Sequence, residues 1–449
     1  MTKINQSIFK AYDIRGIYPK EINEETVYRI SQAYVEFVQP KEVVLGKDVR
    51  LSSPSLWKAA AQGIIDAGVD VIDINTISTD MLYFCVAYYG FTGGITISAS
   101  HNPVDYNGIK IVREKAIPLS SDSGLKDILQ IALKYKRISA KKKGRIVKKE
   151  ITEDYINHVQ SFIDISRIKA LKIVANANFG LAGETVKKIT RDMPLNIIGL
   201  NFSPDGSFPK GRPDPLVPQN RQEVIKKIKE TEADIGVAWD ADADRCFFFD
   251  EAGEFIEGYF ITALLAKTFL ERYPGGKIIF DPRLTWANID TVKENGGIPL
   301  INKCGHTFFK ERMRKENAIF AGEMSAHYYF RNNFYADNGM IPFLIIIETL
   351  STTGKSLSKL VAPLKNKYFV SGEINMEATN TQSILKEMEN RYSDATVEHI
   401  DGLSIEYHDW RFNLRPSNTE PLLRLNLEAR SKILMEKKRD EVIAFINRF

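Results

Sequence analysis

The sequence predicts an α/β protein in which three similar α/β domains with mixed sheets precede a C-terminal α+β domain, all around a central cleft. Three observations predict this fold. The chain has 449 residues, which is more than one hydrophobic core usually organises. Near-continuous apolar strands alternate with helical stretches, as in sheets that helices cover on both faces. One order of elements also occurs three times before it changes near residue 366.

Each repeat consists of an apolar strand with a polar tip, a helical stretch, a second strand, and a third strand that ends in a loop with reactive side chains. The first strands are expected at 43–50, 172–180 and 277–286, and the second at 70–79, 196–206 and 298–308. The third strands lead into SASHNP (98–103), DADADR (240–245) and GEMSAH (322–327). Because ligands gather beyond the carboxyl ends of such strands, we expect these three loops to meet in the cleft.

The repeats set the expected domain boundaries. The basic run KKKGR at 141–145 is typical of a solvated linker and marks the first of them. Beyond residue 366, short strands and two helical stretches read as a separate α+β domain. The predicted domains are 1–149 with the SASHNP loop, 150–250 with the DADADR loop, 251–365 with the GEMSAH loop, and 366–449 with the loop RPSNTEP (415–421).

Composition predicts a soluble, cytoplasmic protein that binds neither nucleic acid nor membrane, and nothing in the sequence indicates an obligate protein partner. Charged residues make up 26% of the chain, hydrophobic residues 44%, and the net charge is only +4. Three cysteines are too few and too scattered for a disulfide framework, which fits a reducing compartment. The longest apolar run, near 340–350, is too short to span a bilayer.

Three aspartates in DADADR indicate a metal site. Asp240, Asp242 and Asp244 lie at alternate positions and would share one face of an extended segment. Their mutual repulsion favours a bound cation, and hard oxygen ligands at this density suit Mg²⁺. The intervening alanines remove bulk, and Arg245 could add a phosphate contact. A solvated acidic loop is the alternative interpretation.

Ser100 in SASHNP is a candidate for covalent chemistry, although a local hydrogen bond in a polar turn would also explain it. The sequence has no GxSxG motif that would indicate an acyl-transfer triad. Adjacent residues of a strand point to opposite faces, so we expect Ser100 and His101 to be poorly placed as a nucleophile and base.

Two further polar clusters could bind a sugar phosphate. The turn 415–421 is rich in hydrogen-bond donors that suit an anion, although an ordinary polar hairpin has a similar composition. Its donors are Arg415, Ser417, Asn418 and Thr419. The second cluster could grip sugar hydroxyls, although a single histidine is more often structural. It comprises Glu323, Ser325 and His327, with His306 nearby in the sequence CGH.

Six motifs occur in the order typical of the α-D-phosphohexomutases, and the chain resembles that family over nearly its whole length. These motifs are FKAYDIRG (9–16), TISASHNP (96–103), DYNGIK (105–110), DADADR, GEMSAH and RPSNTEP. Stretches such as 244–259 and 337–344 are most similar to the bacterial phosphomannomutases of that family. Arg283 in DPR, where many relatives have lysine, is also shared with that group.

The resemblance implies that Ser100 carries a phosphoryl group, which it exchanges with a hexose monophosphate by way of a hexose 1,6-bisphosphate that is both intermediate and activator. It further implies one Mg²⁺ per chain, with Ser100, Asp240, Asp242 and Asp244 as ligands. Near the moving phosphoryl group it places Arg15, Lys110 and Arg245. Candidates for the general acid or base are His101, His306, His327 and Lys110.

By the same resemblance, Glu323 and Ser325 read the sugar hydroxyls, and the RPSNTEP loop holds the phosphate that does not react. The implied activity interconverts mannose 6-phosphate and mannose 1-phosphate for GDP-mannose synthesis, and the only partners expected are small sugar phosphates. A phosphoglucomutase or an enzyme of dual specificity is the closest alternative. A phosphatase-like hydrolase and a non-catalytic binding protein are two others, and the intact serine and aspartates argue against the second of these.

One departure from the family concerns the metal loop. Alanines stand at 241 and 243, where the family usually has glycine at the first position and glycine or another residue at the second. Alanine disfavours positive φ, but we expect it to be tolerated here because it is small.

Overall fold

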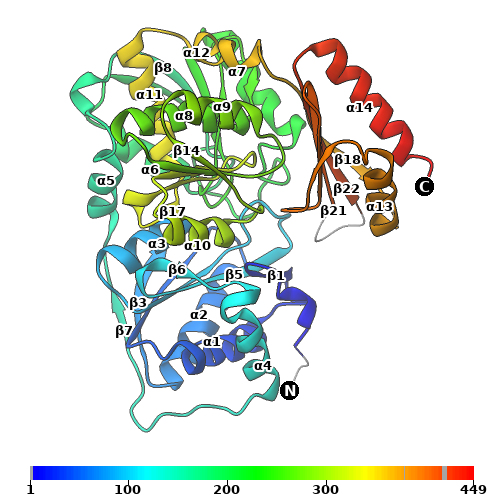
Figure 1. Ribbon diagram of the computed structural model, residues 1–449. Helices are drawn as coiled ribbons and strands as arrows, with labels where there is room; N and C mark the ends of the chain where they lie inside the picture. Colours follow the sequence, from blue (N-terminus) through cyan, green and yellow to red (C-terminus); the bar gives the residue numbers. More distant parts are fainter. Residues whose placement is uncertain (1–3, 379, 417–421) are drawn as a thin grey trace. The chain divides into compact units, whose positions relative to one another are not determined.

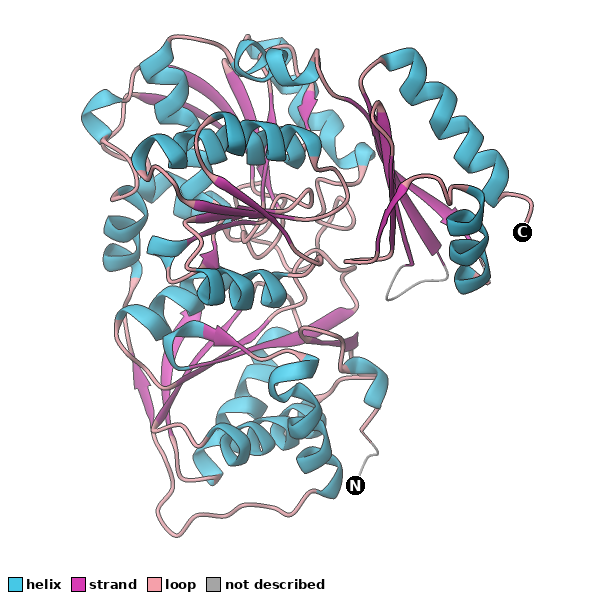
Figure 2. Cartoon of the chain, viewed as in Figure 1, coloured by secondary structure: helices cyan, strands magenta, loops and turns pink. Residues whose placement is uncertain are grey.

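The computed structural model describes residues 4–378, 380–416 and 422–449, in which strands and helices alternate along most of the chain (Figures 1 and 2). The chain divides into two compact units. Unit 1 comprises residues 1–255 and 327–356, and unit 2 comprises residues 256–326 and 357–449.

The first sheet of unit 1 is mixed, as predicted. Its strand order is β1-β5-β4-β2-β3-β7, and β6 pairs with β5. Strands β2, β3, β4 and β7 are parallel, whereas β5 runs antiparallel to β1 and β4. The strands are β1 (Ile14–Ile17), β2 (Glu42–Lys47), β3 (Asp70–Thr76), β4 (Gly93–Ile97), β5 (Tyr106–Arg113), β6 (Ile117–Pro118) and β7 (Ile146–Lys148).

Helices cover both faces of this sheet (Figure 1). On one face, α1 (Glu24–Val38) packs against α2 (Ser53–Asp66) and α4 (Lys126–Lys134), and their apolar side chains form one core with the strands. On the other face lies α3 (Thr79–Tyr88), most of which is buried. Helix α1 begins where the Asn23 side chain accepts the Thr26 N–H, a standard N-cap.

The second sheet of unit 1 has the order β12-β11-β10-β8-β9. Its strands are β8 (Leu171–Asn176), β9 (Leu195–Leu200), β10 (Ile235–Trp239), β11 (Cys246–Phe249) and β12 (Phe255–Ile256). Strands β8, β9 and β10 are parallel, and β11 turns back beside β10. The helices of this part are α5 (Thr152–Gln160), α6 (Ala182–Ile189) and α7 (Gln222–Thr231).

Unit 1 ends with the antiparallel pair β16 (Tyr328–Phe330) and β17 (Ala336–Asp337), followed by α11 (Met340–Thr353). Helix α11 contains the longest apolar run of the sequence and is almost wholly buried. The Trp239 indole N–H, at the end of β10, donates to the Gly339 carbonyl just before α11, at 2.8 Å. This contact fixes the end of β10, where the DADADR loop begins.

Unit 2 contains the third parallel motif, in which β13 (Lys277–Phe280) lies between β14 (Ile298–Ile301) and β15 (Phe320–Gly322). Helices α8 (Gly258–Arg272) and α9 (Trp286–Glu294) pack against one another, and α10 (His306–Glu316) contacts β13 and β15. Helix α12 (Leu357–Lys365) packs against α8. The predicted repeat is therefore present a third time.

The last sheet of unit 2 is wholly antiparallel, with the order β18-β22-β21-β20-β19. Its strands are β18 (Phe369–Glu377), β19 (Thr396–Glu398), β20 (Leu403–Glu406), β21 (Trp410–Pro416) and β22 (Leu422–Ala429). Helices α13 (Thr381–Arg391) and α14 (Lys432–Ile446) pack on one face of it (Figure 2). This arrangement confirms the predicted α+β domain.

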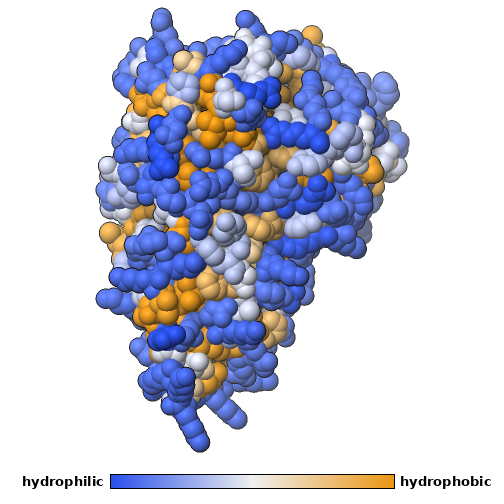
Figure 3. All heavy atoms as spheres, turned by 90° about the vertical axis from the view of Figure 1, so that its left-hand side faces the viewer, coloured by the Kyte–Doolittle hydropathy of each residue, from blue (hydrophilic) through white to orange (hydrophobic). Residues whose placement is uncertain are grey.

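The observed first strands are shorter than the predicted ones, because the polar tips leave the ladder and form loops. Strand β2 ends at Lys47, for example, where the sequence predicted a strand to residue 50. None of the helices in the described ranges is long and apolar enough to cross a membrane. The face drawn in Figure 3 is covered mainly by hydrophilic residues, with smaller apolar areas between them.

Candidate active site

The serine loop (residues 98–103) follows β4, whose five residues are all buried. Ser100 adopts a left-handed backbone with φ of 48° and is only 2% exposed. Its N–H donates to Ser98 Oγ at 3.0 Å, and its own Oγ donates to Asp240 Oδ2 at 2.8 Å. The fold therefore brings the first and second repeats together at the serine and the first aspartate.

The expectation for His101 was wrong. Its Nδ1 lies 3.0 Å from Ser100 Oγ, because Ser100 belongs to a left-handed turn and the two side chains do not alternate as in a strand. Burial, together with Arg245, Arg15 and Arg212, lowers the pKa of His101 well below its usual value. A neutral imidazole therefore lies within hydrogen-bonding distance of the serine hydroxyl.

The aspartate loop (residues 240–245) follows β10 and is buried throughout. One oxygen from each of Asp240, Asp242 and Asp244 lies within 4.8 Å of the others. Ala243 has a φ of 56°, in the positive range that alanine disfavours and that glycine would adopt more easily. A left-handed alanine costs about 1–2 kcal/mol, which the close packing of this buried loop can offset.

Two cations neutralise part of this acidic cluster. Lys110 Nζ on β5 lies 2.7 Å from Asp242 Oδ2 and 2.6 Å from Asp244 Oδ2. Arg245 Nε lies 2.8 Å from Asp240 Oδ2. Burial raises the pKa of Asp240 to about 7, with Arg245 opposing and the other two aspartates adding to the effect. Burial and Asp244 would raise the pKa of Asp242 as well, but Lys110 and its hydrogen bonds hold it below the usual value.

The hydrogen bonds of Asp242 fall on one of its two oxygens. Its Oδ2 accepts from Thr79 Oγ1 at 2.6 Å, from Ser98 Oγ at 3.1 Å and from Lys110 Nζ. Among the residues that the structure describes, no hydrogen-bond donor lies within 3.5 Å of the buried Asp242 Oδ1 or Asp244 Oδ1, although His327 Nε2 is 3.6 Å from the second. Buried carboxylate oxygens without a donor are costly, and hard cations take such oxygens as ligands. The donor set therefore fits a divalent cation such as Mg²⁺.

Arg15 and His327 also lie at this site. Arg15, on β1, donates to Asn102 Oδ1 of the serine loop and pairs with Asp13 at 2.7 Å. His327 forms a β-bridge with Arg245, and its Nε2 lies 3.6 Å from Asp244 Oδ1. Although GEMSAH was expected to act as one sugar-reading loop, its last residue belongs to unit 1 beside the aspartates.

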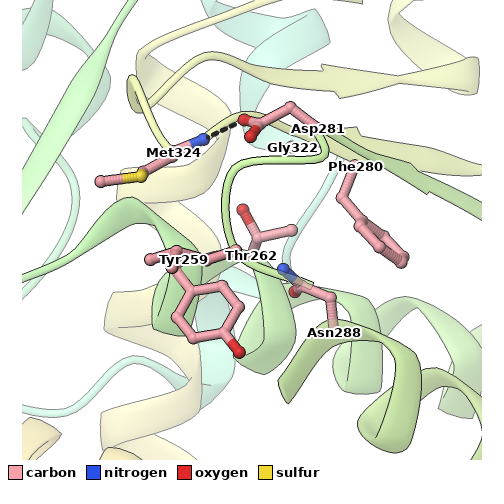
Figure 4. A pocket seen from close by; sticks show the side chains of 8 residues that line it. Tyr259, Thr262, Phe280, Asp281, Asn288, Gly322 and Met324 are labelled. Atoms are coloured by element: carbon pink, nitrogen blue, oxygen red, sulfur yellow. Dashed lines mark hydrogen bonds between the residues drawn. The ribbon is translucent and has the colours of Figure 1, made fainter. Parts of the chain in front are cut away.

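In unit 2, the GEMSAH loop is tied to the CGH turn and to the end of β13. Glu323 Oε2 accepts the Gly305 N–H at 3.1 Å, next to His306. Asp281 Oδ2 accepts the Met324 N–H at 2.7 Å, beside a narrow pocket that Tyr259, Thr262 and Asn288 also line (Figure 4). These contacts fix the two residues that precede Ser325.

Arg415 stands at the end of β21 and faces Glu373 of β18, with its Nη2 3.5 Å from the carboxylate. Arg283 and Arg424 lie 3.7 Å and 3.4 Å from the same Glu373 carboxylate. Arg283 also pairs with Asp281 at 2.7 Å, so three guanidinium groups face two carboxylates. The one positive charge in excess suits an anion. Ser417, Asn418 and Thr419 lie outside the described residues.

Several residues of the site were missed in the sequence. Asp48 and Arg50 follow β2 and bind the serine loop, and Thr79 at the start of α3 binds Asp242. Arg212 donates to the His101 carbonyl at 3.0 Å and pairs with Asp214. The polar tip KDVR at the end of a predicted strand was a signal for the first two, whereas the sequence offers no comparable signal for Arg212.

Fold and site together define a phosphohexomutase. Models of the phosphoglucomutase/phosphomannomutase family match in order: alpha/beta/alpha domain I at residues 6–138, domain II at 153–253, domain III at 257–368, and the C-terminal domain at 373–445. The chain belongs to this family.

The similarity to known proteins extends over nearly the full length of both chains. The chain is 45% identical to a phosphomannomutase of Escherichia coli, with 98% of each chain covered, and 46% identical to a phosphomannomutase of Vibrio cholerae, with the same coverage. A crystal structure of a phosphoglucomutase/phosphomannomutase family protein from Burkholderia thailandensis is similar at a TM-score of 0.89 and 31% identity, covering 99% of this chain and 98% of that one.

Proposed function

We propose that this protein is a phosphomannomutase that interconverts mannose 6-phosphate and mannose 1-phosphate and so supplies GDP-mannose synthesis. The full-length similarity to two proteins named phosphomannomutase supports the substrate. The observation that carries the chemistry is the buried Ser100 Oγ, 2.8 Å from Asp240 Oδ2. It belongs to a cluster in which two carboxylate oxygens have no donor within 3.5 Å among the described residues.

In this proposal Ser100 carries the phosphoryl group. The phosphoserine P–O bond breaks and Ser100 Oγ takes up a proton, while a P–O bond forms to the free hydroxyl of the hexose monophosphate, whose proton passes to a base. The resulting hexose 1,6-bisphosphate turns over. Its other phosphoryl group then moves to Ser100 Oγ, which gives up its proton, and the sugar oxygen that is released takes up a proton. Both steps are phosphoryl transfers, for which positioning and charge neutralisation supply most of the catalysis.

One Mg²⁺ per chain would be held by Asp240, Asp242, Asp244 and a phosphoserine oxygen, and it would neutralise charge on the phosphoryl group when bound. Lys110 donates to two of the aspartates, and Arg245 donates to the third. These cations keep the carboxylates oriented, and they add positive charge where the phosphoryl group moves. Arg15, bound to the serine loop, adds a third.

For proton exchange with Ser100 Oγ, geometry favours His101, whose Nδ1 lies 3.0 Å from that oxygen. Lys110 is engaged with two carboxylates and acts here as a charge. His306 and His327 remain candidates for the base that accepts the proton of the attacking sugar hydroxyl. We assign the sugar hydroxyls to Glu323 and Ser325, and the non-reacting phosphate to the RPSNTEP loop, with Arg415, Ser417, Asn418 and Thr419.

A coupled assay with mannose 1-phosphate and glucose 1-phosphate, each with a trace of the matching 1,6-bisphosphate and with Mg²⁺, tests the proposal. We expect a higher kcat/KM for the mannose substrate and one phosphate on Ser100 by peptide mass. Ser100→Ala, measured alongside, gives the background rate. Equal kcat/KM values would indicate dual specificity, and steady release of inorganic phosphate with no hexose 6-phosphate would indicate a hydrolase instead.

A further inference from the structure

Arg50 lies in the turn between β2 and α2, and its side chain is fully buried. Its guanidinium group donates to four backbone carbonyls of one segment. Nη2 reaches Ser100 O at 2.8 Å and Asn102 O at 2.7 Å. Nη1 reaches Pro103 O at 2.7 Å and Tyr106 O at 3.1 Å. One side chain therefore binds the serine loop from the reactive residue to the start of β5.

Asp48 holds this guanidinium in place. Its Oδ2 lies 3.3 Å from Arg50 Nε and also accepts the Ala99 N–H, while its Oδ1 accepts the Arg50 N–H and the Ser53 hydroxyl. The Phe208 ring lies 5.0 Å from the guanidinium carbon. Arg50 is thus clamped by residues from two parts of unit 1.

The serine loop needs such support. The left-handed backbone conformation is less favourable by about 1–2 kcal/mol for a residue other than glycine, and Ser100 adopts it with φ 48°. Glycine would remove this cost, but it has no hydroxyl. The left-handed turn also directs successive carbonyls away from any strand ladder, and a buried carbonyl without a donor costs about 1–3 kcal/mol. The planar fork of an arginine offers enough donors for all four carbonyls, whereas lysine has a single nitrogen.

We propose that Arg50 is a positioning residue for phosphoryl transfer: by binding the carbonyls of residues 100, 102, 103 and 106, it holds Ser100 in the left-handed turn that aims Oγ at Asp240. This inference rests on the proposed role of Ser100. Both terminal nitrogens of Arg50 are occupied by carbonyls, so its effect on the reaction passes through the serine loop and not through contact with phosphate.

The pattern continues along the loop. The one carbonyl in 100–103 that Arg50 does not bind, that of His101, accepts from Arg212 Nε at 3.0 Å. Arginine side chains thus bind all four carbonyls of Ser100–Pro103. The negative oxygen ends of carbonyl dipoles would destabilise the negative charge of a nearby phosphoserine. Guanidinium groups bound to those oxygens offset this destabilisation.

The test compares Arg50→Lys and Arg50→Gly with the wild-type protein. After the displacement of about 1 Å that a loosened loop allows, a loss of about a hundredfold in rate is typical. We therefore expect kcat of both variants to fall by about that factor, with KM changed less than threefold. The rate at which glucose or mannose 1,6-bisphosphate phosphorylates Ser100, followed by intact mass, should fall in parallel. Methylguanidine should restore at least tenfold in Arg50→Gly, and methylammonium should not.

Arg29→Lys is the matched control. Arg29 is also buried in unit 1 and donates to a carbonyl, that of Ala132, at 2.7 Å, but it lies in α1 away from the serine loop. It should lower the denaturation midpoint without lowering kcat. If the glycine variant fails to fold, Asp48→Asn replaces it, because this change loosens the guanidinium without removing it, and it should lower kcat about tenfold at unchanged KM.

The outcomes distinguish a failure of the role proposed for Ser100 from a failure of the role proposed for Arg50. A wild-type protein that takes no phosphate on Ser100 overturns the proposed role of the serine. A phosphorylated wild-type protein together with an Arg50→Lys variant of normal kcat overturns the role of Arg50 alone. So does a loss of kcat that methylguanidine does not restore in a folded Arg50→Gly variant, or an unchanged kcat in Asp48→Asn.

Discussion

Lys110→Met should weaken the metal-free protein and strengthen its binding of Mg²⁺. The Lys110 side chain is 4% exposed and lies 2.7 Å and 2.6 Å from two buried carboxylates. Methionine has a similar length but no charge. Removing one partner of a buried ion pair costs about 3–5 kcal/mol, because the other charge remains buried. We expect a loss of this size in the free energy of unfolding without metal.

The same charge opposes a bound cation. The three aspartates, balanced by Lys110 and Arg245, leave one net negative charge, and the variant has two. Two unit charges about 4 Å apart interact by about 4 kcal/mol at an effective dielectric constant near 20. Relief of only a third of this repulsion is about 1.4 kcal/mol, which corresponds to about tenfold tighter Mg²⁺ binding.

Calorimetric titration with Mg²⁺ and urea unfolding with and without the ion, both at pH 8, measure the two effects. Lys47→Met is the control, because Lys47 lies in the same sheet, on β2, but contacts Asn75 and Trp57, not the aspartates. Mg²⁺ should stabilise Lys110→Met more than it stabilises the wild type. Unchanged or weaker Mg²⁺ binding by a folded Lys110→Met variant would refute the electrostatic reasoning.

Three further predictions concern other parts of the site. Ser100→Ala should abolish nearly all turnover, and intact mass should show no phosphate on the variant. The free energy of unfolding should change by only about 1 kcal/mol, which is typical of the loss of one hydrogen bond. Substantial turnover would contradict the carrier role. Burial raises the pKa of Asp80 to about 7, so the folded protein retains a proton that the unfolded chain loses, and stability should fall by up to about 4 kcal/mol as pH rises from about 4 to about 7. Asp80→Asn should flatten this slope in urea titrations, and an unchanged slope would exclude Asp80 as its source. Arg415→Ala should raise KM for mannose 1-phosphate and mannose 6-phosphate alike, and it should let more hexose 1,6-bisphosphate escape, which chromatography of the reaction mixture measures. A defect in one direction only would contradict a shared phosphate clamp.

The sequence predicted the three repeats because their first and third strands are mostly buried and read as apolar runs, although the second strands β3, β9 and β14 are more exposed. Strands β4 and β10 are buried at every position, and each leads directly into a polar loop. The hydrophobic pattern thus marks both the strand and its end. Those ends also indicated the chemistry, since Ser100 and Asp240 follow them and meet in the structure.

What the sequence could not predict depends on backbone angles and on contacts between distant segments. The rule that adjacent side chains point to opposite faces failed for Ser100 and His101, because it assumes an extended backbone. The residue types alone did not indicate that Ser100 would be left-handed. Arg50 binds carbonyls about fifty residues away in the chain, and Thr79 binds an aspartate of the second repeat. Backbone carbonyls carry no sequence signature, so partners that bind them remain hidden until the fold is known.

The two reactive loops share a feature that explains why these distant partners matter. Each contains a residue with a side chain at positive φ, Ser100 in one and Ala243 in the other. Such backbones persist only where surrounding contacts compensate for the strain. Arg50 binds the Ser100 carbonyl, while close packing holds the aspartate loop, since a Cβ atom at Gly339 would lie 2.3 Å from the Ala243 carbonyl oxygen. The strained residues therefore have fixed positions, and the oxygens of Ser100 and the aspartates keep their arrangement before any ligand binds. Preorganised charge needs no rearrangement during a reaction. In the proposed mechanism, these supporting contacts therefore contribute to catalysis together with the residues that they hold.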